Sequence, residues 1–505
     1  IDDIVSGLFS ALVTLDQLSP IIYAAPNGPA QMVAEKLTVR LAQHLLQSGE
    51  ALSSSSSTDQ FDRALLVLVD RQIDLAVVMS HSWTYQPLVH DLLDMHLNQV
   101  RLMVEEELPN GHIQVQEKLC DLNSEHDEFW ANNANVIYPL VMQKASALSS
   151  DYQEVRNRLN KLTAQQQQAA SSEFDNNAAA SSSSSSTTKE LSSFVTSLPQ
   201  LQKQKRLIDT HININHALLS KINERQLDQF FRLEESILLD RKASRKPLFA
   251  EVLNMLSDSS GSPADKLRLF LIYYLCSPSL GKDQLAQLQQ SLDDQGLLHT
   301  SSVVNSSSST DADDEQLKQT TAPFEHAFEH IKQVKTLFGA ASSSTAIGAN
   351  QSSSALDSLS SIFSAGISSF TPQHKDFPLT RLVDALMNNA NLRSTTSSSS
   401  SANAIVAQAQ SYLCFDPKLV ALSGQAASSV HSVPVHQRKQ TPFHKAIVFV
   451  VGGGCYNEYQ NLQEYAKRKT VKQSRTPTNV IYGSTEIFDA EEFLSQANII
   501  GQMMG

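Results

Sequence analysis

Short apolar runs and helical patterns alternate at both ends of the 505-residue chain. The apolar runs lie at residues 20–23, 65–69 and 446–451. Runs this short, bounded by turn or charged residues, predict buried strands. Helical patterns follow at 30–46 and 458–467, and another short strand is expected at 479–482. Right-handed strand–helix–strand crossovers place strands in parallel, so these ends predict an α/β domain with a mostly parallel sheet.

The middle of the chain has helical periodicity almost throughout. Residues 87–100 and 379–387 are expected to be helical, and 108–300 almost wholly so. Segments 151–162 and 201–233 outline a long hairpin, and Pro199 is expected to break or kink its second arm. The predicted fold is therefore an α/β domain interrupted by a large all-α insertion. The expected domains are 1–107 with 405–505, and 108–404 with a hairpin near 140–233.

Serine tracts interrupt this pattern at 53–57, 181–186, 306–309 and 397–401. Such tracts cannot bury enough apolar surface to offset chain entropy, so we expect disordered surface loops there. Within the low-complexity stretch 301–375, large apolar residues recur at three- and four-residue steps opposite an almost uncharged serine face. They are Leu356, Leu359, Phe363, Ile367 and Phe370. This pattern is typical of a helix that enters loosely packed, curved bilayers. Packing of the same helix on the domain is the alternative.

Composition excludes several functional classes. The net charge of −13 argues against nucleic-acid binding, which needs a basic surface. The four cysteines form no C-x-x-C pair, so neither a disulfide framework nor a zinc knuckle is expected. The longest apolar runs are far below the ~20 residues of a membrane span. The first residue is Ile1 rather than methionine, and we read the chain as a fragment that lacks an N-terminal part.

Three short motifs suggest chemistry, and each has a structural alternative. Gly452, Gly453 and Gly454 follow a predicted strand but lack the remaining glycine or lysine of a nucleotide-binding loop, which favours a tight turn. His326 and His330 match the H-x-x-E-H pattern of zinc proteases, yet such a site needs a third ligand, usually a downstream carboxylate, and no Glu occurs between Glu329 and Glu458. No metal or cofactor is therefore expected.

The charged residues after the run at 65–69 are the third case. Asp70, Arg71 and Asp74 could be catalytic carboxylates with a basic clamp. A buried ion pair that orders the loop after the strand is the interpretation we favour.

Several separated segments carry motifs that one family has in the same order. Residues 70–93 contain the D-R-x-x-D, H-x-x-T-Y-Q and D-L-L elements, whose positions here are Asp70, Arg71, Asp74, His81, Trp83, Thr84, Tyr85 and Asp91. Residues 191–212 contain L-P-Q and a downstream T-H, and 266–275 form a long apolar segment. Residues 448–460 contain G-G-G-x-Y-x-E-Y-Q. Together they resemble the SM family, the Sec/Munc-type syntaxin-binding proteins, and most of all its Sly branch between ER and Golgi.

The resemblance implies an arch of three domains, in which a helical third domain is inserted into an α/β second domain. Residues 4–23 are similar to second-domain sequence, so the first domain is expected to be missing. The resemblance also implies a protein without enzymatic activity that templates the pairing of SNARE helices. The implied partners are a syntaxin-type SNARE, a vesicle SNARE and assembled SNARE bundles.

The expected SNARE-binding residues lie on the hairpin: Leu198, Pro199, Leu201, Leu207 and Ile212. The resemblance places Pro199 and Ile212 at positions used for the vesicle SNARE. The apolar residues of this arm exceed one narrow stripe, so some could receive an amphipathic helix in a groove. The alternative is that they all face the domain core. The loop 301–375 resembles a lid over this hairpin, expected to open when its apolar face enters a vesicle membrane.

These observations predict a monomeric, cytoplasmic, non-enzymatic regulator of SNARE assembly, peripherally associated with ER and Golgi membranes and transport vesicles. Two alternatives stay open. One is a zinc metalloprotease that uses His326 and His330. The other is a general helical scaffold that binds coiled coils.

Overall fold

The computed structural model describes residues 1–48, 63–107, 113–172, 184–239, 245–258, 261–277, 280–294, 325–342, 376–388, 400–423, 433–434, 442–472 and 477–504. These residues form two compact units. The first unit holds the described residues of Ile1–His81, Gln226–Ser358 and Thr371–Gly505. The second holds those of Ser82–Arg225.

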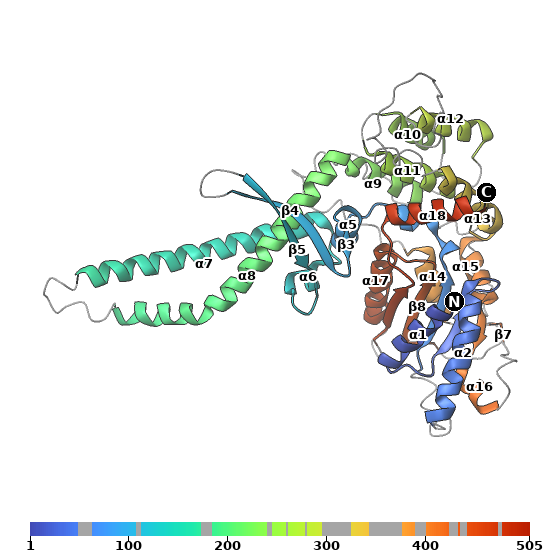
Figure 1. Ribbon diagram of the computed structural model, residues 1–505, viewed down its shortest axis with the longest axis horizontal. Coiled ribbons are helices and arrows are strands. Elements are labelled where there is room, and N and C mark those ends of the chain that lie inside the picture. Colours follow the sequence, from blue (N-terminus) through green and yellow to red (C-terminus); the bar gives the residue numbers. More distant parts are fainter. Residues whose placement is uncertain are drawn as a thin grey trace, which may run out of the picture. The chain divides into compact units, whose positions relative to one another are not determined.

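A six-stranded sheet is the centre of the first unit (Figure 1). Its strands are β1 (Ile21–Ala24), β2 (Leu65–Asp70), β6 (Leu413–Phe415), β7 (Val433–Pro434), β8 (Lys445–Val451) and β9 (Asn479–Ser484). The spatial order is β7-β6-β1-β2-β8-β9. β1, β2, β8 and β9 run parallel, whereas β6 and β7 pair antiparallel. The predicted mostly parallel sheet is therefore confirmed.

Helices cover both faces of this sheet, which is why every residue of β2 is buried. Leu66 and Leu68 share one apolar cluster with α1 (Asp2–Thr14) and α2 (Pro29–Ser48). Leu65 and Val67 share the opposite cluster with α14 (Pro378–Asn388), α15 (Ser400–Ser411) and α17 (Tyr456–Lys472). Successive strand residues point to opposite faces, so one apolar run supplies two cores. The short helix α16 (Pro417–Ser423) packs on α2.

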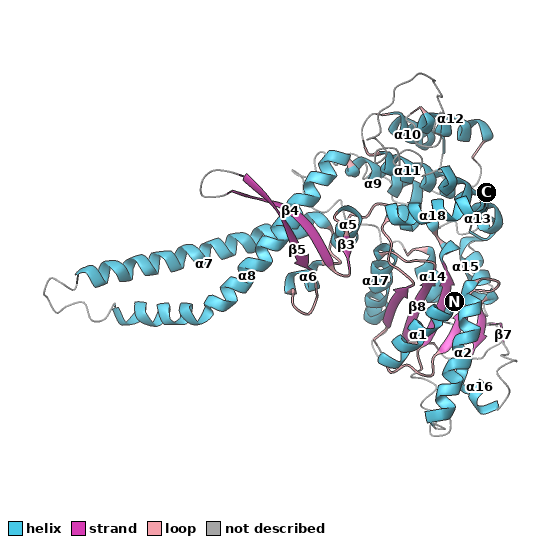
Figure 2. Cartoon of the chain, in the orientation of Figure 1, coloured by secondary structure: helices cyan, strands magenta, loops and turns pink. Residues whose placement is uncertain are grey.

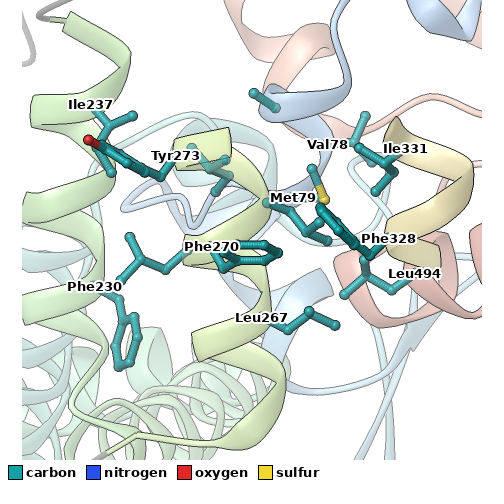
Figure 3. Packing of buried hydrophobic residues seen from close by; sticks show 14 of the residues in the cluster. Val78, Met79, Phe230, Ile237, Leu267, Phe270, Tyr273, Phe328, Ile331 and Leu494 are labelled. Atoms are coloured by element: carbon teal, nitrogen blue, oxygen red, sulfur yellow. The ribbon is translucent and has the colours of Figure 1, made fainter. Parts of the chain in front are cut away.

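A helical layer completes the first unit. It consists of α4 (Leu75–Met79), α9 (Leu227–Leu239), α10 (Arg245–Ser257), α11 (Pro263–Cys276), α12 (Lys282–Asp293), α13 (Glu325–Ser342) and α18 (Ala490–Met504). These helices share one apolar cluster, in which Phe270 of α11 lies near Phe328 of α13 and Met79 of α4 (Figure 3). α11 begins at a capping box between Ser262 and Asp265, with Pro263 in its first turn.

The second unit contains a long helical hairpin and a small sheet (Figure 2). Its elements are α5 (Tyr85–Leu92), β3 (Met95–His96), β4 (Gln99–Glu107), β5 (Ile113–Asp121), α6 (Glu128–Asn133), α7 (Tyr138–Ser172) and α8 (Ser184–Arg225). α7 and α8 pack against each other, and β4 pairs antiparallel with both β3 and β5.

Three expectations for the helical region were wrong. The helix expected at 87–100 ends at Leu92, and β5 interrupts the stretch 108–300. The sequence has a hairpin signal here, Asn110-Gly111 between alternating apolar positions, which explains why strands form. The arm expected at 201–233 is divided at Gln226, whose φ of 51° is incompatible with a continuous helix.

Pro199 lies inside α8 and does not break it. Figure 1 shows α8 changing direction along its course, as a kinked helix does. The two compact units have different bounds from the predicted domains, which are 1–107 with 405–505, and 108–404. The predicted domains refer to the family arch, and they stay a prediction. Among the described residues, no helix is long and apolar enough to cross a membrane.

Candidate functional site: the helical hairpin and its supports

α7 and α8 meet along a heptad-like seam. On α7 the buried or half-buried residues follow one another at steps of four and three: Val141, Ala145, Leu148, Tyr152, Val155 and Leu159. On α8 the same steps join Gln204, Ile208, His211, Asn215, Leu218 and Ile222. This spacing places the residues of each set on one side of their helix, as in a coiled coil. α8 contacts α5 and β4 as well as α7, and the ring of His211 lies against Tyr85 of α5. The seam therefore uses up one face of α8.

Further apolar residues of α8 lie beside the seam. Successive residues turn by about 100° around a helix, which places four residues on one flank of the seam. They are Leu198, Leu201, Ile212 and Leu219, and we call them the α8 stripe. Leu198 is 37% exposed, and the other three are half-buried. Three of the five predicted hairpin residues thus share one flank.

Leu207 and Pro199 lie elsewhere on α8. The same helical geometry places the half-buried Leu207 on the opposite flank. Pro199 is exposed next to Leu198. Leu219 was not among the predicted site residues, although its position seven residues after Ile212 is a helical-face signal.

A buried polar cluster anchors α8 at the base of the hairpin. The ring of His211 lies between Tyr85 on α5 and Asp127, which precedes α6. Burial, and then the Asp127 charge, raise the pKa of Tyr85 well above its usual value. Tyr85 therefore stays protonated. Its hydroxyl forms a hydrogen bond with Nδ1 of His211 over 2.9 Å, and Nε2 of the same ring forms one with Asp127 over 2.9 Å. The second Asp127 oxygen accepts the Trp130 amide and caps α6.

Tyr138, at the start of α7, adds a second anchor. Its hydroxyl donates to the main-chain carbonyl of Asn215 on α8 over 3.0 Å. Both residues are buried. The hydroxyl and the His211 cluster bind α8 one helical turn apart, so they fix the rotation of α8 and with it the direction of the α8 stripe.

The predicted family motif around Asp70 is structural in the first unit. Arg71 makes a bidentate ion pair with Glu458 of α17, at 2.6 and 2.9 Å, and also donates to the main-chain carbonyls of Gly453 and Asp74. Burial lowers the pKa of Arg71, but the Glu458 carboxylate outweighs it and raises that pKa above its usual value. The favoured ion-pair interpretation therefore fits, with its partner 387 positions away in the sequence.

The two aspartates on either side of Arg71 cap helices. Asp74 accepts hydrogen bonds from the amides of Ala76 and Val77 at the start of α4. Asp70 accepts the amide of Ala30 at the start of α2, and its carboxylate lies where a Cβ on Gly28 would stand. Negative charge at a helix N-terminus is stabilising, so both residues fix helix positions.

His81 is clamped between two carboxylates. Its Nδ1 lies 2.8 Å from Glu234, and its Nε2 lies 3.1 Å from Asp265. Burial and the Arg268 charge lower the pKa of His81, but the two carboxylates outweigh them and raise it above the usual value. Each ring nitrogen faces a carboxylate oxygen, and an ionised carboxylate only accepts, so both nitrogens donate and His81 is an imidazolium that joins α9 to α11.

The rest of the motif lies in the second unit and in the glycine turn. The main-chain carbonyl of Trp83 accepts the Tyr138 amide, Thr84 forms a bridge with Ile137, and the half-buried Asp91 lies on α5. Gly452 and Gly453 have φ angles of +101° and +93°, which side chains rarely adopt. A Cβ on Gly454 would stand 2.1 Å from the Tyr482 hydroxyl. The glycines thus form the tight turn expected.

The remaining predicted sites are the zinc site and the lid helix. His326 and His330 lie on α13, which packs closely on α18: a Cβ on Gly501 would stand 2.0 Å from the His326 carbonyl. Within the described ranges, no three His, Cys, Asp or Glu residues come together as metal ligands. The predicted lid helix with Leu356, Leu359, Phe363, Ile367 and Phe370 lies outside the described residues.

Comparisons with known proteins agree with this arrangement. The Sec1 family model matches residues 1–496. The mouse Sec1 family domain-containing protein 1 is 33% identical over 518 aligned positions, covering 99% of this chain and 71% of that protein. The fission-yeast Protein sly1 is also 33% identical, covering 98% of this chain and 70% of that protein.

Solved structures give the same result. The crystal structure of Sly1p in complex with an N-terminal peptide of Sed5p has a TM-score of 0.66 and 26% identity, covering 99% of this chain and 68% of that one. The SM protein Vps45 in complex with the Qa SNARE Tlg2 shares the fold, with a TM-score of 0.56, 16% identity, and coverage of 100% of this chain and 71% of that one. With a family model matched over nearly its whole length, and relatives of the Sly1 type, the chain belongs to the Sec1 family.

Proposed function

We propose that this chain is a non-enzymatic regulator that templates the assembly of SNARE helices for vesicle docking and fusion between ER and Golgi. The observation that carries the proposal is the α8 stripe. It leaves apolar side chains partly uncovered beside a seam that already satisfies the α7–α8 contact. Membership of the Sec1 family and relatives of the Sly1 type support the choice of partner.

The α8 stripe suits an amphipathic helix. Leu198, Leu201, Ile212 and Leu219 run along one flank, so a second helix lying there would make a three-helix contact with α7 and α8. Such helix-in-groove binding uses apolar residues at three- and four-residue steps. The anchors at His211 and Tyr138 hold α8 before a partner arrives, which reduces the entropy lost on binding.

A syntaxin-type Qa SNARE is the first proposed partner. Sly1p was solved with an N-terminal peptide of Sed5p, and Vps45 with the Qa SNARE Tlg2. A vesicle SNARE that contacts Pro199 and Ile212, and assembled SNARE bundles, are the further proposed partners. Peripheral association with ER and Golgi membranes, with Leu356, Leu359, Phe363, Ile367 and Phe370 as a membrane-responsive lid, is part of the same proposal.

The test compares two variants, each with a charged side chain on a different flank of α8. Ile212→Glu places a carboxylate in the α8 stripe, and we expect binding to the purified vesicle SNARE to weaken about tenfold or more. Leu207→Glu is the matched control, since the same change on the opposite flank should leave affinity within about threefold. Circular dichroism and thermal unfolding establish that both variants fold. Equal affinities for the folded Ile212→Glu variant and the unchanged protein would refute the assignment.

A second measurement separates this proposal from a general coiled-coil scaffold. The unchanged protein is offered cognate SNARE helices and unrelated amphipathic helices of the same length and charge. A SNARE template prefers the cognate helices, whereas a general scaffold binds both sets equally.

A further inference from the structure

The ribbon of β4 and β5 in the second unit carries apolar side chains on both faces. Neighbouring residues of a strand point to opposite faces, and the register runs from Gln99 opposite Asp121 to Glu107 opposite Ile113. The inner face includes the buried Val100, Leu102 and Cys120, and β4 contacts α8. The described side chains of the outer face are Gln99, Arg101, Met103, Val115, Glu117, Leu119 and Asp121.

The outer face exposes large apolar side chains. Met103 is 74% exposed, and Val115 and Leu119 are each 57% exposed. A single exposed apolar residue is ordinary, but three on one face of a narrow ribbon form a patch. Such a patch marks an interaction surface.

β5 also has a free edge. The order of the small sheet is β3-β4-β5, so no described strand pairs with the far side of β5. The strand is nine residues long and contains no proline. An edge of this length presents a row of main-chain donors and acceptors, which is a template for another strand.

We propose that β5 binds an extended segment of a partner protein, which adds to the ribbon as a further strand. Main-chain hydrogen bonds to β5 supply affinity, and apolar side chains at alternate positions of the segment pack beside Val115 and Leu119, with Met103 behind them. This surface takes a strand rather than a helix, so it is separate from the α8 stripe and does not depend on SNARE binding.

The charges on the outer face of the ribbon favour a basic partner segment. Among the side chains that the structure describes, the outer face carries two carboxylates, Glu117 and Asp121, against one cation, Arg101, which lies 4.0 Å from Glu117. Opposite charges across neighbouring strands are stabilising, so the segment carries a basic side chain facing Glu117.

A second copy of the chain fits less well. A symmetric antiparallel pairing centred on Glu117 would bring Val115 opposite Leu119 of the second copy. It would also bring the two Glu117 carboxylates opposite each other, and like charges there are destabilising. The occupant is therefore a basic segment of another protein.

The probe is a capped peptide as long as β5, with valine at alternate positions and one central lysine. We expect it to bind the full chain and to slow amide exchange at residues 113–121. Leu119→Gln should weaken binding about tenfold. Lys118→Gln, one residue away on the inner face, is the matched control and should not weaken it.

N-methylated peptides test the main-chain hydrogen bonds and need no protein variant. Successive amides of a strand point to opposite edges, so methylation of one alternate set should abolish binding while methylation of the other set is tolerated. Absence of binding, or equal binding of both methylated peptides, would overturn the proposal. So would dimerisation through β5 without peptide, measured by sedimentation, because it would make a second copy the occupant.

Discussion

Helices α11 and α8 use apolar residues in opposite ways. In α11 every residue from Asp265 to Tyr273 is buried, because helices of the first unit surround it. In α8 the seam residues from Ile208 to Ile222 are buried, while the α8 stripe beside them is half-covered or exposed. A helix that is buried all round serves the core. A helix that satisfies one partner and leaves a second flank open is prepared for another partner.

The largest expected effect comes from a substitution in the core around α11. Phe270 is fully buried, and its ring lies 5.1 Å from that of Phe328. Phe270→Ala should lower the free energy of unfolding by about 3–5 kcal/mol, because it leaves a cavity. Urea denaturation measures this loss. Binding of SNARE helices by the molecules that remain folded should not change, and Leu337→Ala on the exposed side of α13 is the control.

Next comes the clamp that fixes α11 to α9. His81→Phe removes the cation that lies between Glu234 and Asp265 and leaves Arg268, 3.9 Å from Asp265, beside them, at a cost of about 3 kcal/mol at low pH. The pKa of His81 is raised in the folded protein, so its stabilisation is complete below about pH 6.5 and is lost as the pH rises through the raised value. Thermal unfolding of both proteins from acid to alkaline pH measures the difference. A difference that does not shrink with rising pH would contradict the imidazolium assignment.

The smallest effect is expected at the base of the hairpin. Tyr138→Phe removes the hydroxyl that donates to the Asn215 carbonyl, at a cost of about 1 kcal/mol. Amide exchange should quicken in α8 and stay unchanged in α11. Tyr152→Phe, on the same helix and half-buried in the seam, is the control. If amide exchange quickened equally in α11, the two helices would not respond separately to the substitution.

The sequence predicts elements with one strong period better than it predicts pairings. β2, β8, α17 and the glycine turn were expected, because an unbroken apolar run or a helical period marks each of them. The β4–β5 ribbon was missed because its apolar positions also match a helix, and only Asn110-Gly111 signals the turn.

Partners far apart along the chain could not be predicted. Arg71 with Glu458, and Tyr85 with His211 and Asp127, come together only when the tertiary structure forms. On the hairpin, the predicted SNARE-binding residues stay a prediction. The list of predicted residues did not assign Leu207 and Ile212 to opposite flanks of α8, because that assignment depends on which side of α8 meets α7.

The register between β2 and β8 has a consequence for biosynthesis. Leu65 pairs with Ala446, so the inner strand of the sheet meets its neighbour only after the intervening chain has been made. At ordinary ribosomal speeds of about 5–20 residues per second, that delay is roughly 20–75 s. During this interval an apolar strand lacks one neighbour. A nascent chain of this kind should therefore depend on chaperones while it is still attached to the ribosome.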